Sequence, residues 1–193
     1  MSNEVVLDIE TKNTFQDVGG FFPTKLNVSV VVAYYYEFDE YRHYLEDDLP
    51  RLYNDLERSG RIITYNGIGF DMPVLNQHYA GDLLQLPQCD MLAIIRESLG
   101  FRIKLDDVAS ATIGTKKSAH GLLAVKWWKE GKYQEVIDYC QQDVKVTKDV
   151  YEFGVKNGFI LFDDRTGERR QVNIDFKEEK KKDDAAINLT MGF

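Results

Sequence analysis

The chain has 193 residues, of which 44% are hydrophobic and 29% charged, a composition typical of one globular domain with a sizeable core. The formal net charge of −8 argues against a protein that grips long duplex DNA, because such binding depends on many Lys and Arg contacts to phosphate. It does not exclude a nuclease, since divalent cations held by carboxylates would supply the positive charge that faces phosphate.

The sequence lacks the features of membrane and secreted proteins. No apolar run approaches the roughly 20 residues that span a bilayer, and acidic residues among the first ten positions argue against a signal peptide. The two cysteines, Cys89 and Cys140, have no partner at the spacing of a metal site. Free thiols suit a reducing compartment, so we expect a cytoplasmic protein with no membrane partner.

The first third of the chain alternates short apolar segments with turns. Segments rich in Val, Ile and Tyr predict strands over residues 5–9, 25–36, 41–45 and 61–65. Apolar residues at helical spacing, with Pro50 in the first turn, predict a helix over residues 46–58. Strands and a helix in this order predict a mixed sheet within an α/β architecture.

The rest of the chain is predicted to be mostly helical, with helices over residues 72–79, 91–99, 104–113, 121–130 and 134–153. Residues 159–162 and 170–176 flank a turn-forming segment and predict a hairpin. The charged run KEEKKKDD predicts a solvated, flexible end. We therefore expect a domain over residues 1–162, a hairpin extension over 163–176 and a charged tail over 177–193.

Two carboxylates, Asp8 and Glu10, stand near the end of the first predicted strand. Residues two apart in a strand point to the same face, so both carboxylates project together. Such a pair is costly on a buried strand unless a cation neutralises it, and Mg²⁺ and Mn²⁺ prefer oxygen ligands. Roughly one such triplet arises by chance in an acidic chain of this size, so it is weak evidence alone.

A second motif, YNGIGFD over residues 65–71, follows the fourth predicted strand. Asn66 could hydrogen-bond a substrate or brace the loop. Phe70 could stack on a base, although an aromatic residue here is more often part of the core. Asp71 opens a predicted helix, where its residue type favours an N-cap, but the same placement would let its carboxylate face a metal.

A third motif lies on the last predicted helix. Tyr139 and Asp143 are four residues apart, which places them on one face, one turn from each other. Taken alone, this spacing fits an ordinary amphipathic helix with a half-buried Tyr and a solvated Asp. Cys140 is one position round the helix from Tyr139, so we expect its side chain to face elsewhere.

Together and in this order, the motifs resemble the D-x-E, N-x-x-x-F-D and Y-x-x-x-D elements of the DEDD superfamily of 3′→5′ exonucleases, in its tyrosine subtype (DEDDy). The segment YNGIGFDMPVL is similar to part of the proofreading domain of family-B DNA polymerases, and small stand-alone or helicase-associated exonucleases are a closer likeness. The resemblance covers about residues 4–162. The histidine subtype has His five residues before the last Asp, where this chain has Asp138.

The resemblance implies an RNase H-like mixed sheet flanked by helices and a site for two divalent metal ions, Mg²⁺ or Mn²⁺. Asp8 would bridge both metals, and Glu10 and Asp143 would hold the metal that activates the attacking water. Asp71 would serve the second metal through water. Tyr139 would orient the attacking water or help to deprotonate it. Because tyrosine has a reference pKa near 10, positioning suits it better than proton abstraction.

The family also implies a substrate. Thr11, Asn66 and Phe70 would hold the 3′-terminal nucleotide of a single strand with a free 3′ end. The reaction would hydrolyse phosphodiester bonds from that end and release nucleoside 5′-monophosphates. DNA is favoured over RNA, although no residue reports on contacts to the 2′-hydroxyl. A helicase or polymerase would suit as a partner for so small a nuclease.

Two other functions stay open at this point. One is a catalytically weak nucleic-acid-binding or accessory module of a helicase or polymerase complex. The presence of all four motif carboxylates and of Tyr139 counts against it. The other is an RNase H-like endonuclease, against which the second and third motifs favour an exonuclease.

Overall fold

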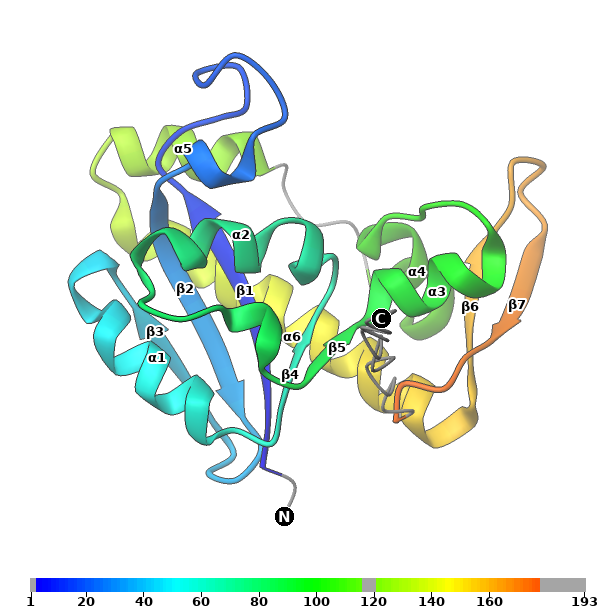
Figure 1. Ribbon diagram of the computed structural model, residues 1–193. Helices are drawn as coiled ribbons and strands as arrows, with labels where there is room; N and C mark the ends of the chain where they lie inside the picture. Colours follow the sequence, from blue (N-terminus) through cyan, green and yellow to red (C-terminus); the bar gives the residue numbers. More distant parts are fainter. Residues whose placement is uncertain (1–2, 116–120, 178–193) are drawn as a thin grey trace, which may run out of the picture.

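The computed structural model describes residues 3–115 and 121–177, so all but the first residue of the predicted tail lies outside the described residues. Its main sheet has five strands in the order β3-β2-β1-β4-β5 (Figure 1). Strand β1 is antiparallel to β2 and parallel to β4, which makes the sheet mixed, as predicted. The strands are β1 (Glu4–Thr11), β2 (Val28–Tyr35), β3 (Glu40–Tyr44), β4 (Arg61–Thr64) and β5 (Gln88–Asp90).

The six predicted helices are confirmed, with small differences at their ends. They are α1 (Leu49–Arg58), α2 (Asp71–Leu75), α3 (Met91–Leu99), α4 (Leu105–Ile113), α5 (Gly121–Lys129) and α6 (Tyr133–Asn157). At α2 the helix predicted over residues 72–79 changes to a tighter 3₁₀ turn at Asn76–His78, and α6 continues four residues past its predicted end at residue 153. None of the helices in the described ranges is both long and apolar enough to cross a membrane.

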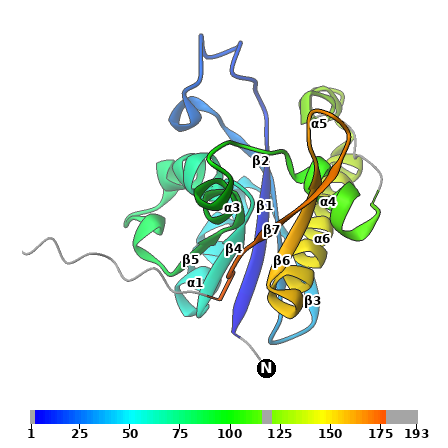
Figure 2. The ribbon, with the colours of Figure 1, turned by 90° about the vertical axis from the view of Figure 1, so that its right-hand side faces the viewer.

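Side chains of β1 alternate between two apolar cores, one on each face of the sheet. Val6 belongs to the core beneath α6, together with Val30 and Val32 of β2. Val5 and Leu7 belong to the opposite core, beneath α1 and α2. Figure 2 shows α6 on one side of β1 and α1 on the other. Even-numbered residues of β1 therefore face α6, and this parity decides where its carboxylates point.

The strand prediction needs two corrections, one boundary and one missing strand. The strand predicted over residues 25–36 begins at Val28, because Pro23–Lys25 forms a 3₁₀ turn. Strand β5 was not predicted at all. It has only three residues, Gln88–Asp90, which is too short for a hydrophobic period to be recognised.

The predicted hairpin is confirmed as a separate two-stranded sheet of β6 (Phe159–Asp163) and β7 (Arg169–Asn173). The Thr112 hydroxyl of α4 both donates to the Leu161 carbonyl and accepts from the Leu161 amide, each at 3.0 Å. The second strand ends earlier than the predicted residue 176. Ile174 and Phe176 instead return to the core, where Phe176 packs directly on Gly154 of α6.

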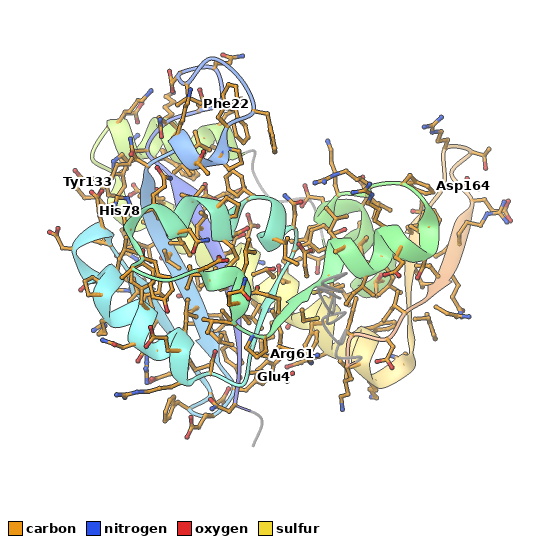
Figure 3. All side chains as sticks on the ribbon, in the orientation of Figure 1. Glu4, Phe22, Arg61, His78, Tyr133 and Asp164 are labelled. Carbon is orange, nitrogen blue, oxygen red and sulfur yellow. The ribbon has the colours of Figure 1, made fainter. Side chains whose placement is uncertain are left out.

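A partly buried ion pair closes the start of β1, and its two residues lie side by side in Figure 3. Arg61 donates from Nε to Glu4 at 3.0 Å and from Nη1 to the Phe176 carbonyl at 2.8 Å. Its Nη2 donates to the Tyr151 hydroxyl at 2.6 Å, and that hydroxyl donates to Glu4 at 2.9 Å. We call these four residues the Arg61 cluster. The cluster joins β1, β4, α6 and the segment after β7.

Candidate metal centre

Three of the predicted metal ligands lie together between β1 and α6. Asp8 and Glu10 share the parity of Val6 and therefore point toward α6, which supplies Asp143. One carboxylate oxygen from each of the three lies within 4.8 Å of the other two. We call Asp8, Glu10 and Asp143 the carboxylate cluster.

The electrostatics of the cluster are those of carboxylates crowded in a place with little water. Burial raises the pKa of Asp8 well above its usual value, and the charges of Asp71, Asp143 and Glu10 raise it further. Burial is also the main cause that raises the pKa of Glu10, followed by Asp143 and Asp71. Bringing these groups together costs free energy that a bound divalent cation would offset.

Asp71 lies close enough to Asp8 for its charge to raise the pKa of that carboxyl. The pairing of β1 with β4 ends at Val6 and Ile63, so the later residues of β1 have that side free for another element. There Asp71 accepts a hydrogen bond from the Ile9 backbone. Burial, and then the charge of Asp90, raises the pKa of Asp71 to about 7. Asp71 lies beside the carboxylate cluster but is not one of its three members.

The N-cap interpretation of Asp71 is wrong. Phe70 occupies the N-cap position of α2, and Asp71 is the first residue of the helix, with its side chain turned toward β1.

Cys140 corrects another expectation. Its Sγ atom lies 3.4 Å from the Asp8 carbonyl oxygen and 3.6 Å from Asp8 Oδ2, so the thiol faces the site rather than away from it. The reason is that Cys140 lies at the centre of the buried face of α6, in line with Val136 and Val144, whereas Asp143 lies at the edge of that face. Burial and the nearby charge of Asp8 raise the pKa of the thiol, which keeps it protonated and able to donate to Asp8.

Tyr139 is on α6 one turn before Asp143, as predicted, but the structure does not place it against the cavity described below. It is partly buried, and its ring meets Trp127 of α5 edge-on at 6.2 Å between centroids. This contact fixes the plane of the tyrosine ring. Trp127 was not singled out for this role from the sequence.

The loop that carries the second motif is held by Asp90, which sequence reasoning missed. Asp90 accepts from the backbone amides of Asn66 at 2.9 Å and Ile68 at 3.1 Å, and it also caps α3. Asn66 is in the left-handed region, with φ of 75°. A Cβ atom on Gly67 would come within 2.2 Å of Thr64 Oγ1, so only glycine fits there. The signal was an Asp directly before the predicted helix 91–99, a common N-cap position.

A cavity of about 330 Å³ opens beside the carboxylate cluster, and we call it the acidic cavity. Thr11 and Phe70 line it, as the substrate prediction requires. Phe15 lines it as well and meets Phe70 edge-on at 5.9 Å. Leu122 of α5, 71% exposed, adds an apolar side chain from another element. Phe15 and Leu122 were not predicted, because neither belongs to a motif.

Asn66 does not line this cavity. Its side-chain oxygen accepts a hydrogen bond from Arg102 Nη2 at 2.7 Å, on the loop between α3 and α4. Of the three predicted substrate residues, the structure thus brings Thr11 and Phe70 to the acidic cavity and directs Asn66 toward another loop.

The donor chemistry of the carboxylate cluster fits a hard divalent cation. All three ligands offer carboxylate oxygen, and the Asp8 and Glu10 carboxyls are both destabilised in their ionised form by burial and by other carboxylates. A bound divalent ion would instead stabilise the ionised form of each carboxylate around it. The cluster could therefore hold a metal ion.

Comparison with known proteins agrees with this arrangement. A search of curated proteins finds no significant match. Among solved structures, the family B DNA polymerase from the hyperthermophilic archaeon Pyrobaculum calidifontis is similar with a TM-score of 0.61 and 16% identity, over 79% of this chain and 24% of the polymerase. The chain thus spans about a quarter of that polymerase. The profile of the RNase H superfamily matches residues 5–154. The profile covers most of the chain, and the central strand of the mixed sheet carries two carboxylates of the cluster. The chain therefore belongs to the RNase H superfamily.

Proposed function

We propose that the protein is a metal-dependent 3′→5′ exonuclease of the DEDDy type that acts on single-stranded nucleic acid. The observation that carries the proposal is the meeting of Asp8, Glu10 and Asp143 within 4.8 Å of one another, with Asp71 beside them. These four residues come from three separated motifs, and the acidic cavity opens next to them. The catalytic unit would be residues 1–162.

The carboxylate cluster would hold the metal that serves the attacking water, and Asp8 would be shared with a second metal served by Asp71 through water. Two Mg²⁺ or Mn²⁺ ions, when bound, stabilise the entering and leaving oxygens of a phosphoryl displacement. Cys140 donates to Asp8 and so helps to fix the orientation of its carboxylate. Tyr139, with its ring held by Trp127, would position the attacking water.

The acidic cavity supports a terminal nucleotide as the bound group. Its volume of about 330 Å³ is at the small end for ligand cavities, which suits one nucleotide rather than a duplex. Phe15 and Phe70 offer aromatic surface on which a base can stack. Thr11 is held in place by a hydrogen bond from its hydroxyl to the Asn13 carbonyl at 2.8 Å. We propose DNA as the preferred strand.

The competing functions make different predictions for this site. An RNase H-like endonuclease would cut within a strand whose 3′ end is blocked, whereas an exonuclease would not. An accessory module of a helicase or polymerase complex would bind the strand in the presence of metal without turnover. The similarity to a polymerase concerns the fold, and it makes a polymerase or helicase a partner worth testing.

The test uses 5′-labelled single-stranded DNA and RNA of the same sequence, each with Mg²⁺, with Mn²⁺ and with EDTA. We expect metal-dependent shortening from the 3′ end, one nucleotide at a time, and release of nucleoside 5′-monophosphates. Asp143→Asn should abolish shortening. Asp138→Asn is the matched control, because Asp138 is an exposed carboxylate of the same helix that bonds Gln134.

Intact substrate in every lane, or equal loss in both variants, would overturn the assignment. Cleavage of a 3′-blocked strand would replace it with an endonuclease.

A further inference from the structure

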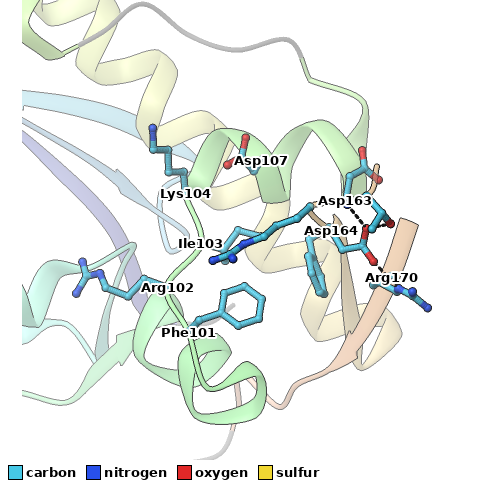
Figure 4. A pocket seen from close by; sticks show the side chains of 11 residues that line it. Phe101, Arg102, Ile103, Lys104, Asp107, Asp163, Asp164 and Arg170 are labelled. Carbon is cyan, nitrogen blue, oxygen red and sulfur yellow. Dashed lines mark hydrogen bonds and ion pairs between the residues drawn. The ribbon is translucent and has the colours of Figure 1, made fainter. Parts of the chain in front are cut away.

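A second cavity, of about 750 Å³, lies between the loop at residues 101–104 and the turn of the β6–β7 hairpin (Figure 4). It shares no lining residue with the acidic cavity. The proposed catalytic residues do not reach it, so the proposed reaction leaves it without a role. We call it the hairpin groove.

The hairpin groove has an aromatic floor. Phe101 is 50% exposed and meets Phe162 edge-on at 6.0 Å between ring centroids. Ile103 adds apolar surface beside them. A half-exposed aromatic ring that is braced from behind is the kind of platform on which a nucleic-acid base stacks, and such stacking tolerates any base.

Positive charge gathers around this floor although the chain as a whole has a net charge of −8. Arg102, Lys104 and Arg165 all line the groove. Within residues 3–115 and 121–177, neither Lys104 nor Arg165 forms an ion pair with another side chain. Their charges are therefore available to an anionic ligand.

The other charged groups of the groove are largely satisfied within the protein. Asp163 pairs with Arg169 at 2.9 Å, and Asp164 pairs with Arg170 at the same distance. Figure 4 shows Arg170 on the outer side of Asp164. The two carboxylates of the hairpin are thus neutralised by neighbouring arginines. The third carboxylate of the lining, Asp107, is outnumbered by the cations Arg102, Lys104 and Arg165, so the groove keeps a positive charge.

Two hydrogen bonds join the wall of the groove to the second motif. Arg102 donates to the Asn66 side chain at 2.7 Å, and the Tyr65 hydroxyl donates to the Ile103 carbonyl at 2.9 Å. Asn66 and Asp71 are five residues apart, so their Cα atoms are at most about 18 Å from each other. The hairpin turn also points to the same end of the molecule as the end of β1 (Figures 1 and 2).

We propose that the hairpin groove binds the substrate strand a few nucleotides upstream of its 3′ end. A base stacks on Phe101, and the phosphates next to it contact Lys104 and Arg165. The same strand continues past the Asn66 loop and places its terminal nucleotide in the acidic cavity. This inference rests on the proposed function, because it assigns the groove to the substrate of that site.

The test measures binding and cleavage separately. Binding is followed by the fluorescence anisotropy of a 5′-labelled twelve-nucleotide DNA strand in Ca²⁺ over a series of KCl concentrations. Cleavage is compared between that strand and a dinucleotide in Mg²⁺. The variants are Arg165→Glu and Phe101→Ala. The control is Lys156→Glu, which reverses an exposed charge near the C-terminal end of α6, away from the groove.

We expect Arg165→Glu to weaken binding of the long strand at every salt concentration and to lower the dependence of log Kd on log salt by about one. Phe101→Ala should weaken binding about fivefold or more. For the wild type we expect a lower KM for the long strand than for the dinucleotide. Arg165→Glu and Phe101→Ala should both reduce this difference in KM, and Lys156→Glu should leave it unchanged.

The outcomes separate the two proposals. Active wild-type protein with unchanged binding in both groove variants would overturn the groove and keep the exonuclease. Inactive wild-type protein that binds the strand through Arg165 and Phe101 would overturn the exonuclease and support the groove as a nucleic-acid site. Wild-type protein that does not bind the strand would overturn the groove assignment.

Discussion

The two ends of β1 place carboxylates in opposite circumstances. At its start, Glu4 meets the guanidinium of Arg61 and the hydroxyl of Tyr151, so its charge is matched and its hydrogen bonds are made. Near its other end, Asp8 and Glu10 meet further carboxylates, which raise the pKa of both. One strand thus carries a charge arrangement that stabilises the fold and another that strains it.

The difference teaches how each end should respond to substitution. Removing one partner from a buried ion pair leaves the charge of the other partner unpaired in an apolar environment, and the fold loses stability. Removing one carboxylate from a crowded group relieves repulsion, so the fold keeps or gains stability while a metal ligand is lost. Four predictions test this contrast, beginning with the largest effect.

Asp8→Asn should lower turnover by about a thousandfold or more, because the proposed metal site loses one charged carboxylate ligand. In metal-free buffer the same variant should unfold at an equal or higher urea concentration than the wild type. Single-turnover kinetics and urea unfolding in EDTA measure the two effects. A variant that unfolds well before the wild type would show that Asp8 is a structural residue.

Arg61→Met should lower the free energy of unfolding by about 3–5 kcal/mol, because Glu4 and the Phe176 carbonyl lose their buried donor. Activity per folded molecule should change little, since the Arg61 cluster lies at the far end of β1 from the carboxylate cluster. Arg58→Met is the control, as Arg58 is exposed at the end of α1. Equal unfolding curves for both variants would contradict a stabilising role for the Arg61 cluster.

Tyr139→Phe should lower the rate of cleavage by about ten- to a hundredfold, because the hydroxyl that positions water is lost while the ring contact with Trp127 stays. Tyr133→Phe removes a hydroxyl from an exposed tyrosine of the same helix and should cleave at the wild-type rate. Rates under saturating metal would show the contrast. A wild-type rate of cleavage by Tyr139→Phe would show that the Tyr139 hydroxyl has no role in the reaction.

The fourth prediction concerns the pH dependence of stability. Burial raises the pKa of Asp71 to about 7, above the value of about 4 expected in the unfolded chain, so the folded state binds the proton more tightly. In EDTA, stability should therefore fall as the pH rises from about 4 to about 7. Urea unfolding across that range should show a weaker fall for Asp71→Asn. A wild-type stability that rises with pH relative to this variant would contradict the assignment.

Much of the site could be predicted because the periodicity of strands and helices determines which side chains share a face. The parity of β1 puts Asp8 and Glu10 on one face, and the helical spacing of Tyr139 and Asp143 puts them one turn apart. Once α6 packs on β1, the first and third motifs must meet. The six helices and the hairpin follow from equally local patterns.

The rest depends on contacts that no local pattern contains. Asp71 can bond the Ile9 backbone because the pairing of β1 with β4 stops at Val6, and a sequence does not show where two strands part. Asn66 turns from the acidic cavity toward Arg102, which is 36 residues later. Cys140 faces Asp8 because of the line along which α6 crosses β1, which helical spacing alone does not set.

The Arg61 cluster has a consequence for how the chain matures. Its hydrogen bonds join Glu4 to Tyr151, 147 residues later, and Arg61 to Phe176, 115 residues later. Contacts this distant in sequence form late and slow the folding of small domains. During synthesis β1 leaves the ribosome before Tyr151 and Phe176, so the partners of Glu4 and Arg61 become available only after these later residues have emerged. The nascent domain therefore completes this cluster only after Phe176 has emerged.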